Sequence, residues 1–230
     1  MTVKVRNLTY SINDKHILSK VSFSLEEGHI TLFVGKSGSG KTTILRALVG
    51  LVEPTSGDIS IEGESPALVF QQPELFPHMT VLNNCMHPQI IVKHRSKEEA
   101  KDKTFNLLKF LDIEDIAHSY PHHLSGGQKQ RVAIVRSLCM DKRTLLFDEP
   151  TSALDPFSTS AFKRLLESLR DQNLTLCVST HDMHFVQGCL DRVYLVDQGE
   201  IVSTYDKRYG DLDDEHPLNL YLNLYLNSGK

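Results

Sequence analysis

Short apolar runs alternate with amphipathic segments along most of this chain. The runs that have the length of buried strands are Ile30 to Val34, Ala67 to Phe70, Thr144 to Phe147, Leu174 to Val178 and Arg192 to Asp197, which we expect to be the final strand. The segments with apolar residues at helical spacing are Thr43 to Val49, the residues after Ser96, the residues after Ser125, and Phe157 to Arg170. Strands that alternate with helices predict an α/β fold with a mostly parallel sheet and helices on its faces.

The N-terminal part follows a different pattern. Val3 to Tyr10 and Ile17 to Leu25 alternate or cluster apolar residues at strand spacing, with a turn between them. Val52 to Gly57 is predicted to be a loop because it contains several breaker residues, and Ile59 to Ile61 reads as a short strand. From the residues alone, Tyr10 is either a packing residue or an aromatic surface on which a base could stack.

Proline and capping residues set further boundaries. Between Glu74 and Arg95 the sequence shows no regular hydrophobic pattern. Its prolines, Pro88 among them, are expected to exclude a long helix. Ser96 with Glu99 three residues later forms a capping box, which predicts the start of a helix. The tail, Leu218 to Asn227, alternates Leu and Tyr with Asn and Leu, and we expect a small helix or edge packing there.

The stretch after the first buried run carries recognisable chemistry. It fits the phosphate-loop pattern of Gly, four residues and Gly-Lys-Ser/Thr, and its members are Gly35, Lys36, Ser37, Gly38, Ser39, Gly40, Lys41 and Thr42. Its glycines let the backbone wrap a polyphosphate, and the N-terminus of the following helix favours an anion. Lys41 adds a positive charge near the β- and γ-phosphates, and the Thr42 hydroxyl can ligate Mg²⁺. A strand before and a helix after favour a nucleoside triphosphate site over a flexible turn.

Composition and charge narrow the classes of partner. The 230 residues have a net charge of −4 and no long basic block, so nothing suggests nucleic acid. Met1 to Lys15 lacks the apolar core of a signal peptide, and no apolar stretch is long enough to span a bilayer, so we expect any membrane role to need a partner. The cysteines lack metal-ligand spacing and fit a reducing, cytosolic compartment. They are Cys85, Cys139, Cys177 and Cys189.

Three further stretches have both a functional and a simpler explanation. Asp148 and Glu149 end an apolar strand, where carboxylates could hold Mg²⁺ and orient water, although a strand often ends in acidic residues by chance. Leu124 to Gln128 places a serine N-cap before two glycines, which is either an anion site or a plain capped helix. His181, with Asp182 after it, ends the next strand, and a lone histidine is more often structural than catalytic.

Together, in this order and spacing, these stretches resemble the ATP-binding cassette (ABC) ATPases from about Val3 to Val202. In that family the glycine-rich loop is the Walker A motif, and Tyr10 falls at the aromatic residue that stacks on adenine. Gln71 falls at the Q-loop glutamine, which approaches Mg²⁺ and the attacking water. Leu124 to Gln128 is the signature motif.

The resemblance also assigns the remaining motifs and the ligands, ATP and Mg²⁺. Asp148 and Glu149 fall at the Walker B aspartate and the catalytic glutamate, Ser152 to Asp155 is the D-loop, and His181 is the switch histidine. The catalytic residues it implies are Glu149, His181, Gln71 and Lys41, and the Mg²⁺ ligands are Thr42, Gln71 and Asp148. The residues it implies for ATP contact are Tyr10, Gly35, Lys36, Ser37, Gly38, Ser39, Gly40, Lys41, Thr42, Thr43, Gln71, Ser125, Gly126, Gly127, Gln128, Asp148 and Asp155.

Architecture and partners follow from the same resemblance. It implies one nucleotide-binding domain over residues 1–230, with a small N-terminal antiparallel β lobe, a helical subdomain at about 72–140 and a short tail at about 206–230. Members form ATP-dependent head-to-tail dimers in which Ser125 and Gly127 of one copy close over the ATP of the other. They dock on a separate membrane permease, here through the region from Gln71 to His94, at the cytoplasmic face of the membrane.

Within the family, several sequence stretches resemble those of the importers of polar amino acids, which also work with a substrate-binding protein. The stretches that carry this likeness are Phe70 to Gln72, Leu75 to Val81, Pro150 to Pro156 and Thr180 to Met183. Phosphate and methionine importers share parts of them, and an exporter or lipoprotein-release ATPase is the runner-up. A chromosome or repair ATPase would carry long coiled coils, a translation-type protein two cassettes, and a small-molecule kinase no signature motif.

Some positions depart from the family pattern. The segment between Gly50 and Gln71 is short, so we expect a trimmed antiparallel lobe. Phe157 stands where an acidic residue is common, and Val135 and Ser137 replace more usual alanines. Thr144 weakens the apolar run before Asp148. The chain stops soon after the expected last strand, so no regulatory C-terminal domain is expected.

Overall fold

The computed structural model of the protein describes residues 2–13, 15–152, 154–186, 191–210 and 216–227. Its centre is a six-stranded sheet in the order β5-β6-β7-β3-β8-β9. The strands are β3 (Ile30–Val34), β5 (Ala67–Val69), β6 (Thr144–Asp148), β7 (Thr175–Thr180), β8 (Arg192–Asp197) and β9 (Glu200–Asp206). All neighbours pair in parallel except β9, which is antiparallel to β8. The predicted α/β fold with a mostly parallel sheet is therefore confirmed.

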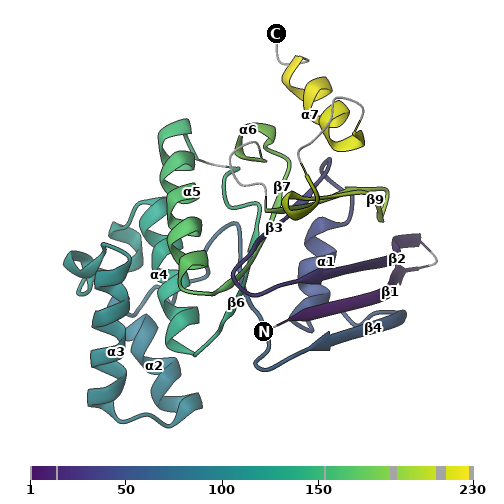
Figure 1. Cartoon of the computed structure of the whole chain (residues 1–230). Coiled ribbons are helices and arrows are strands. Elements are labelled where there is room, and N and C mark those ends of the chain that lie inside the picture. The colour runs from purple at the N-terminus through teal and green to yellow at the C-terminus, as the bar shows by residue number, and fades with distance from the viewer. Residues whose placement is uncertain (1, 14, 153, 187–190, 211–215, 228–230) are drawn as a thin grey trace.

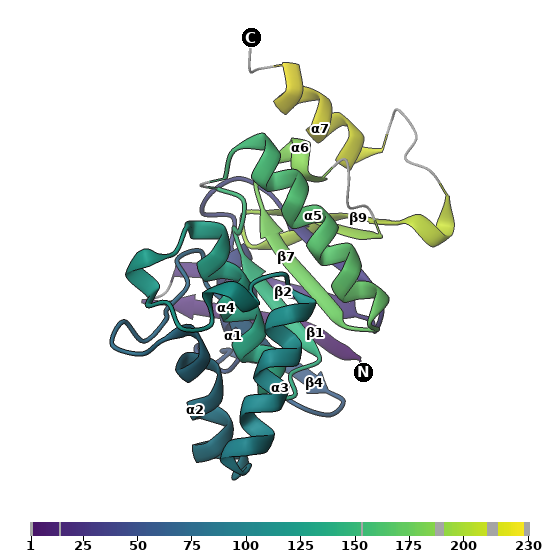
Figure 2. The same ribbon diagram turned by 90° about the vertical axis from the view of Figure 1, so that its left-hand side faces the viewer.

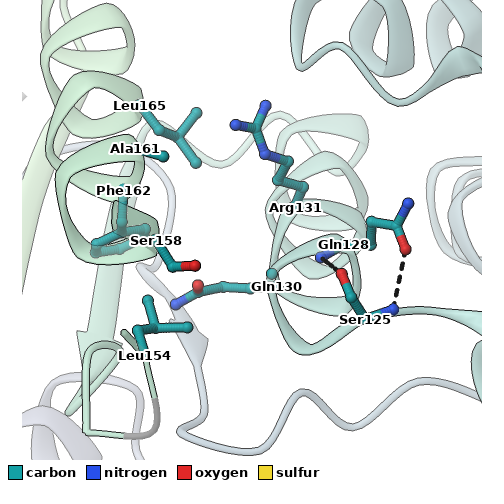
Figure 3. A pocket seen from close by; sticks show the side chains of 10 residues that line it. Ser125, Gln128, Gln130, Arg131, Leu154, Ser158, Ala161, Phe162 and Leu165 are labelled. Carbon is teal, nitrogen blue, oxygen red and sulfur yellow. Dashed lines mark hydrogen bonds between the residues drawn. The ribbon is translucent and has the colours of Figure 1, made fainter. Parts of the chain in front are cut away.

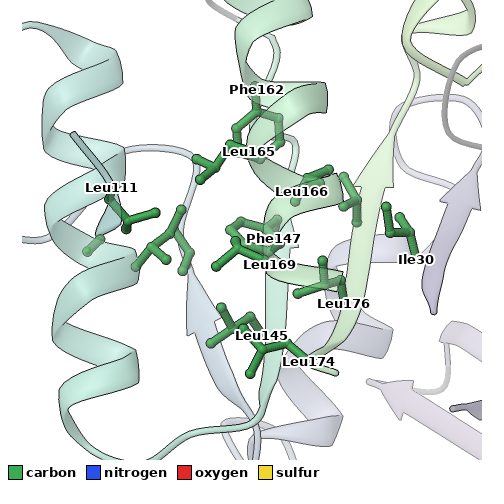
Figure 4. Packing of buried hydrophobic residues seen from close by; sticks show 14 of the residues in the cluster. Ile30, Leu111, Leu145, Phe147, Phe162, Leu165, Leu166, Leu169, Leu174 and Leu176 are labelled. Atoms are coloured by element: carbon green, nitrogen blue, oxygen red, sulfur yellow. The ribbon is translucent and has the colours of Figure 1, made fainter. Parts of the chain in front are cut away.

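Helices cover both faces of this sheet, which is why β3, β6 and β7 are buried along their whole length. Successive residues of β3 point to opposite sides, so Ile30, Leu32 and Val34 join one core cluster while Phe33 joins the other. Helix α5 (Pro156–Asp171) packs on the first face, and α1 (Lys41–Leu48) packs on the second (Figure 1). Figure 4 shows side chains of α5 packed against the strands of the first face.

A second, three-stranded antiparallel sheet covers α1 from the outside. Its order is β2-β1-β4, and its strands are β1 (Val3–Ile12), β2 (Lys15–Leu25) and β4 (Ser56–Ile61). The predicted strands are present, but β4 begins at Ser56, inside the predicted loop, because Ser56 and its neighbours pair with β1. Register shifts interrupt β1 on both sides.

Three helices form a separate group beside the sheet, namely α2 (Val81–Lys93), α3 (Lys97–Phe110) and α4 (Gly126–Cys139) (Figure 2). They lie within residues 72–140. The predicted capping box of Ser96 and Glu99 starts α3, and the predicted N-cap Ser125 starts α4, where it also forms a capping box with Gln128. The core cluster runs from these helices into the main sheet.

The prediction that prolines exclude a long helix before Arg95 is wrong, because α2 has 13 residues with Pro88 inside it. Thr80 caps the helix, and the backbone N–H of Val81 donates to the Ser119 carbonyl at 2.9 Å. Val81 and Cys85 are fully buried, so tertiary packing outweighs the single backbone hydrogen bond that a proline removes.

Arg192–Asp197 is not the final strand, because β9 follows it as an antiparallel edge strand. The chain continues through a short helix, α7 (Pro217–Asn227), so of the two expectations for the tail the helix is correct. Its Leu218 is buried in the core cluster beside Met183 and Phe185 of α6 (Met183–Val186), which the pattern did not predict. One-turn 3₁₀ helices at Glu114–Ile116, Pro121–His123 and Lys207–Tyr209 complete the fold.

Among the described residues, no helix combines the length and the apolar character that crossing a bilayer requires. Cys85, Cys139 and Cys177 are buried free thiols, and Cys189 lies outside the described residues. Burial raises the pKa of the Cys177 thiol, which keeps it protonated.

Candidate active site

The candidate catalytic residues meet at the carboxyl edge of the central sheet. Strands β3, β6 and β7 are parallel neighbours, and Val34 pairs with Thr180 while Asp148 pairs with Ser179. The segments that follow these strands therefore leave the sheet side by side. They are the glycine-rich loop, the segment from Glu149 and the segment from His181, and an open α/β sheet binds its ligands at this edge.

The glycine-rich loop folds tightly onto the start of α1. Gly40 is the N-cap of α1 at a φ of 108°, and a Cβ there would lie 2.8 Å from Leu18 Cδ2. Ser39 Oγ is buried and has no hydrogen-bond partner among the described residues. A buried hydroxyl without a partner is costly, so this loop has a polar group that a ligand oxygen could satisfy.

Lys41 is buried at the first position of α1 and arches back over the loop. Its Nζ donates to the Gly35 carbonyl at 2.8 Å and to the Lys36 carbonyl at 2.9 Å, and lies 3.5 Å from Glu149 Oε1. Burial lowers the pKa of the Lys41 ammonium, and the Glu149 carboxylate opposes that shift. The ammonium is thus surrounded by oxygens at the place where the sequence predicts phosphate.

Asp148 lies beside the loop and accepts two hydroxyl hydrogen bonds on one oxygen. Thr42 Oγ1 donates to Asp148 Oδ1 at 2.8 Å, and Ser179 Oγ donates to the same atom at 2.7 Å. Carboxylate and hydroxyl oxygens are the ligands that Mg²⁺ prefers. Across the described ranges, no group of three His, Cys, Asp or Glu side chains could hold a metal ion. Thr42 and Asp148 fit an Mg²⁺ that takes its other ligands from phosphate and water.

Glu149 is held in place by its backbone and by two side chains. Its φ is +45°, an uncommon value for a residue with a Cβ, and its N–H donates to Ser179 O at 3.1 Å and to Ser179 Oγ at 3.0 Å. Its Oε2 lies 2.7 Å from His181 Nδ1, and half of the His181 side chain is exposed. A carboxylate and an imidazole in contact at the mouth of a phosphate site can hold a water molecule and move its proton.

Gln71 meets the segment after Glu149 rather than the Asp148 carboxylate. Its Nε2 donates to Ser152 Oγ at 2.8 Å, and Ser152 Oγ donates to the Glu149 carbonyl at 3.0 Å. Within the described part of the chain, Gln71 forms no hydrogen bond to Thr42 or Asp148. The predicted Mg²⁺ ligands Thr42 and Asp148 are thus hydrogen-bonded to each other, whereas Gln71 is linked through Ser152 to the Glu149 carbonyl.

The signature stretch lies apart from the glycine-rich loop. Ser125 Oγ accepts from the Gln128 N–H at 3.2 Å, and Gln128 Oε1 accepts from the Ser125 N–H at 2.9 Å (Figure 3). A cavity of about 210 Å³ separates this end of α4 from α5. Among the described residues, no hydrogen bond or ion pair joins Ser125–Gln128 to Gly35–Thr42, and neither Gly126 nor Gly127 has a neighbour that a Cβ would meet.

The other predicted contact residues lie further out. Tyr10 is half-buried on β1 opposite Leu18, at the margin of the second core cluster. Asp155 caps α5, where its Oδ1 accepts from the N–H groups of Phe157 and Ser158. In the D-loop, Ala153 lies outside the described residues.

Sequence reasoning missed Ser179 and the bridging role of Ser152. Ser179 is fully buried, yet its hydroxyl contacts both Asp148 and the Glu149 N–H. A serine directly after the buried apolar run Leu176 to Val178, two residues before His181, was the available signal. The missed hydrogen bond of Gln130, from Nε2 to the Pro150 carbonyl at 3.5 Å, joins α4 to the same segment.

Comparisons with known proteins agree with this arrangement. The ABC transporter family matches residues 18–152, more than half of the chain. The chain is 40% identical over 214 residues to the arginine transport ATP-binding protein ArtM of Bacillus subtilis, covering 87% of this chain and 89% of that protein. It is 35% identical over 213 residues to the glutamine transport ATP-binding protein GlnQ of Escherichia coli, covering 86% and 89%.

Solved structures give the same picture. The structure of cbiO1 from Clostridium perfringens, part of the ABC transporter complex cbiONQ, has a TM-score of 0.82 and 28% identity, and the match covers 98% of this chain and 96% of that one. A dimeric ATP-binding cassette in a post-hydrolysis state, bound to ADP and Pi, has a TM-score of 0.76 and 31% identity, with 89% and 98% covered.

Proposed function

Because this chain belongs to the ABC transporter family as an ATP-hydrolysing subunit, we propose that it powers the import of polar amino acids. The observation that carries the ATPase chemistry is the meeting of Lys41, Asp148 and Glu149 at one edge of the sheet. The amino acid cargo rests on the relatives named above, which are arginine and glutamine transport proteins. Phosphate or methionine import, or lipoprotein release, is the alternative.

The chain's own groups divide the work of phosphoryl transfer. The loop N–H groups and the Lys41 ammonium bind the β- and γ-phosphates, and Tyr10 offers its ring to the adenine. Glu149 orients the attacking water and accepts its proton, while His181, in contact with Glu149, fixes the position of that carboxylate. Bound Mg²⁺, which Thr42 and Asp148 would hold, supplies charge neutralisation on the phosphate oxygens.

A second copy of the chain completes the site. Ser125 and Gly127 lie at the start of α4, where the N–H groups of the first helical turn suit a phosphate, but they make no polar contact with their own glycine-rich loop within the described residues. We assign them to the ATP held by the partner in a head-to-tail homodimer. Asp155 lies in the segment after Glu149, where it caps α5.

The remaining partners are a membrane permease and, indirectly, a substrate-binding protein. We assign the whole chain, residues 1–230, to one nucleotide-binding domain with a helical subdomain at about 72–140 and a tail at about 206–230. The region from Gln71 to His94 presents exposed apolar residues, including Phe76, Ile91 and Val92, and we place the permease there. This puts the chain at the cytoplasmic face of the membrane.

The first test replaces Glu149 by glutamine and measures the mass of the protein by light scattering with and without Mg-ATP. We expect Glu149→Gln to form a dimer only with ATP, and turnover to fall by about a hundredfold or more. Glu98→Gln, an exposed glutamate on α3, is the control and should hydrolyse ATP like the unchanged protein. A Glu149→Gln variant that stays monomeric and still turns over would contradict both the base and the dimer.

The cargo is tested in cells from which the chain has been deleted. Uptake of labelled arginine, glutamine, methionine and phosphate is compared before and after the chain is supplied again. Restored uptake of arginine or glutamine supports amino acid import. Restoration of methionine or phosphate uptake alone would select the alternative and leave the ATPase assignment intact.

A further inference from the structure

The turn between β8 and β9 lies against the glycine-rich loop. It contains two residues, Gln198 and Gly199, between the paired residues Asp197 and Glu200. Both have positive φ, at 46° for Gln198 and 83° for Gly199, which is the conformation of the tight hairpin turn that matches the twist of its strands. Neither residue belongs to a motif that the sequence analysis singled out.

Gly199 joins two other elements through its backbone. Its N–H donates to the Ser39 carbonyl of the glycine-rich loop at 3.0 Å. Its own carbonyl accepts from the Ser19 N–H of β2 at 2.9 Å. The turn is therefore a hydrogen-bonded bridge between the loop and the three-stranded sheet.

These three segments approach too closely for a side chain at the bridge. A Cβ on Gly199 would lie 2.3 Å from the Ile17 carbonyl oxygen and 2.9 Å from the Ile17 carbonyl carbon. The obstacle is backbone, which cannot rotate away as a flexible side chain would. At the other end of the loop, a Cβ on Gly35 would lie 2.1 Å from the Val196 carbonyl of β8. The hairpin thus packs against both ends of the loop.

The hydrogen bond from Gly199 fixes one peptide of the loop. In a trans peptide the C=O and the following N–H point in opposite directions. Holding the Ser39 carbonyl toward Gly199 therefore turns the Gly40 N–H to the opposite side of the loop. Gly40 is the N-cap of α1, where free N–H groups bind phosphate.

We propose that Gly199 is a positioning residue for ATP, whose turn holds the Ser39–Gly40 peptide in the orientation that phosphate binding needs. The inference rests on the proposed nucleotide site and adds to it a residue outside the family motifs described above. Gly199 acts through the loop and touches no reacting atom. Its effect should therefore fall on ATP affinity rather than on the chemical step.

The test compares Gly199→Ala with Gly50→Ala. Gly50 has a similar φ of 72° after α1, but a Cβ there meets nothing within 4 Å, so the two variants share the backbone strain and differ in the clash. We measure the Kd for ATP by calorimetry and kcat and KM by phosphate release. Gly199→Ala should raise Kd and KM by about tenfold or more with kcat changed less than about threefold. Gly50→Ala should stay within about twofold on all three.

If the Kd of Gly199→Ala for ATP stays within about twofold of that of the unchanged protein, the inference is overturned. This holds even if the Tm of the variant falls, because the turn would then contribute to stability alone. If the unchanged protein binds no ATP, the proposed function fails instead. If Gly199→Ala does not fold, amide exchange of the unchanged protein decides. Saturating Mg-ATP should slow exchange at residues 197–200 by about fivefold and leave residues 48–52 unchanged, and equal exchange at 197–200 would overturn the inference.

Discussion

Replacing Ser179 by alanine would remove one hydroxyl that binds the Asp148 carboxylate and the backbone N–H of Glu149 in the proposed site. Ser179 Oγ donates to Asp148 Oδ1 at 2.7 Å and accepts from the Glu149 N–H at 3.0 Å, and the residue is fully buried. Water cannot take its place without entering the core. The loss should therefore be felt by the residue proposed to hold Mg²⁺ and by the residue proposed to orient water.

The contacts that remain set the size of the effect. A hydrogen bond to a charged group contributes about 1.5–3 kcal/mol. Asp148 keeps its hydrogen bond from Thr42 at 2.8 Å, and the Glu149 N–H keeps the Ser179 carbonyl at 3.1 Å, so we take the lower part of that range. Since about 1.4 kcal/mol is a factor of ten, Ser179→Ala should lower kcat roughly 10- to 30-fold.

The assay is steady-state phosphate release at several Mg²⁺ concentrations, with Ser168→Ala as the control. Ser168 is a half-buried serine of α5 whose hydroxyl donates to the Leu165 carbonyl at 2.8 Å. This hydrogen bond stays within α5 and involves neither Asp148 nor Glu149. It should keep kcat within about twofold. If Ser179→Ala keeps more than half of the kcat of the unchanged protein, the hydroxyl does not position the catalytic groups and the reasoning is refuted.

Two stability predictions use features away from the site. Asp206 accepts hydrogen bonds from Arg208 and Arg192, and those bonds, Arg208's first, hold the pKa of the carboxyl well below its usual range. A carboxyl whose pKa is lowered in the folded state adds stability that is complete above about pH 4 and is lost as the pH falls further. In urea unfolding, Asp206→Asn should therefore lower the free energy of unfolding by about 1–3 kcal/mol at pH 7 and by less below pH 4. An equal cost at both pH values would contradict this linkage. Pro88→Ala should raise the free energy of unfolding by about 1–3 kcal/mol, because it restores an N–H for the Asn84 carbonyl inside α2, and a loss of stability would show that the proline fits this helix better than alanine.

The sequence predicted best those features that depend on neighbouring residues. The start of α3 follows from the capping box of Ser96 and Glu99, and the start of α4 follows from the N-cap Ser125, because a helix cap needs nothing beyond its own turn. The glycine-rich loop is local in the same sense. Helix α2 was missed because Pro88 locally disfavours a helix. The burial of Val81 and Cys85, which outweighs this effect, depends on α4 and on residues 117–119, which lie further along the chain.

Features that depend on distant pairing could not be predicted in the same way. In strand β9 the polar Ser203 is half-buried and the apolar Val202 is exposed, so its residue types do not show the alternation of a strand, which forms by pairing with β8. Ser179 looks like any residue of a buried strand until the register places it beside Asp148. Gly199 reads as an ordinary hairpin glycine, and its contact with Ser39 joins residues far apart in the chain.

The contacts of Lys41 determine what ATP has to replace. Its ammonium has three N–H donors, of which two are directed at the Gly35 and Lys36 carbonyls, and it faces the Glu149 carboxylate at 3.5 Å. A γ-phosphate carries more negative charge than a carboxylate, so it competes directly with Glu149 for the ammonium. Phosphate binding then releases the Glu149 carboxylate toward water, while His181 still holds its other oxygen. In this arrangement the proposed base becomes available in the same event that delivers its substrate.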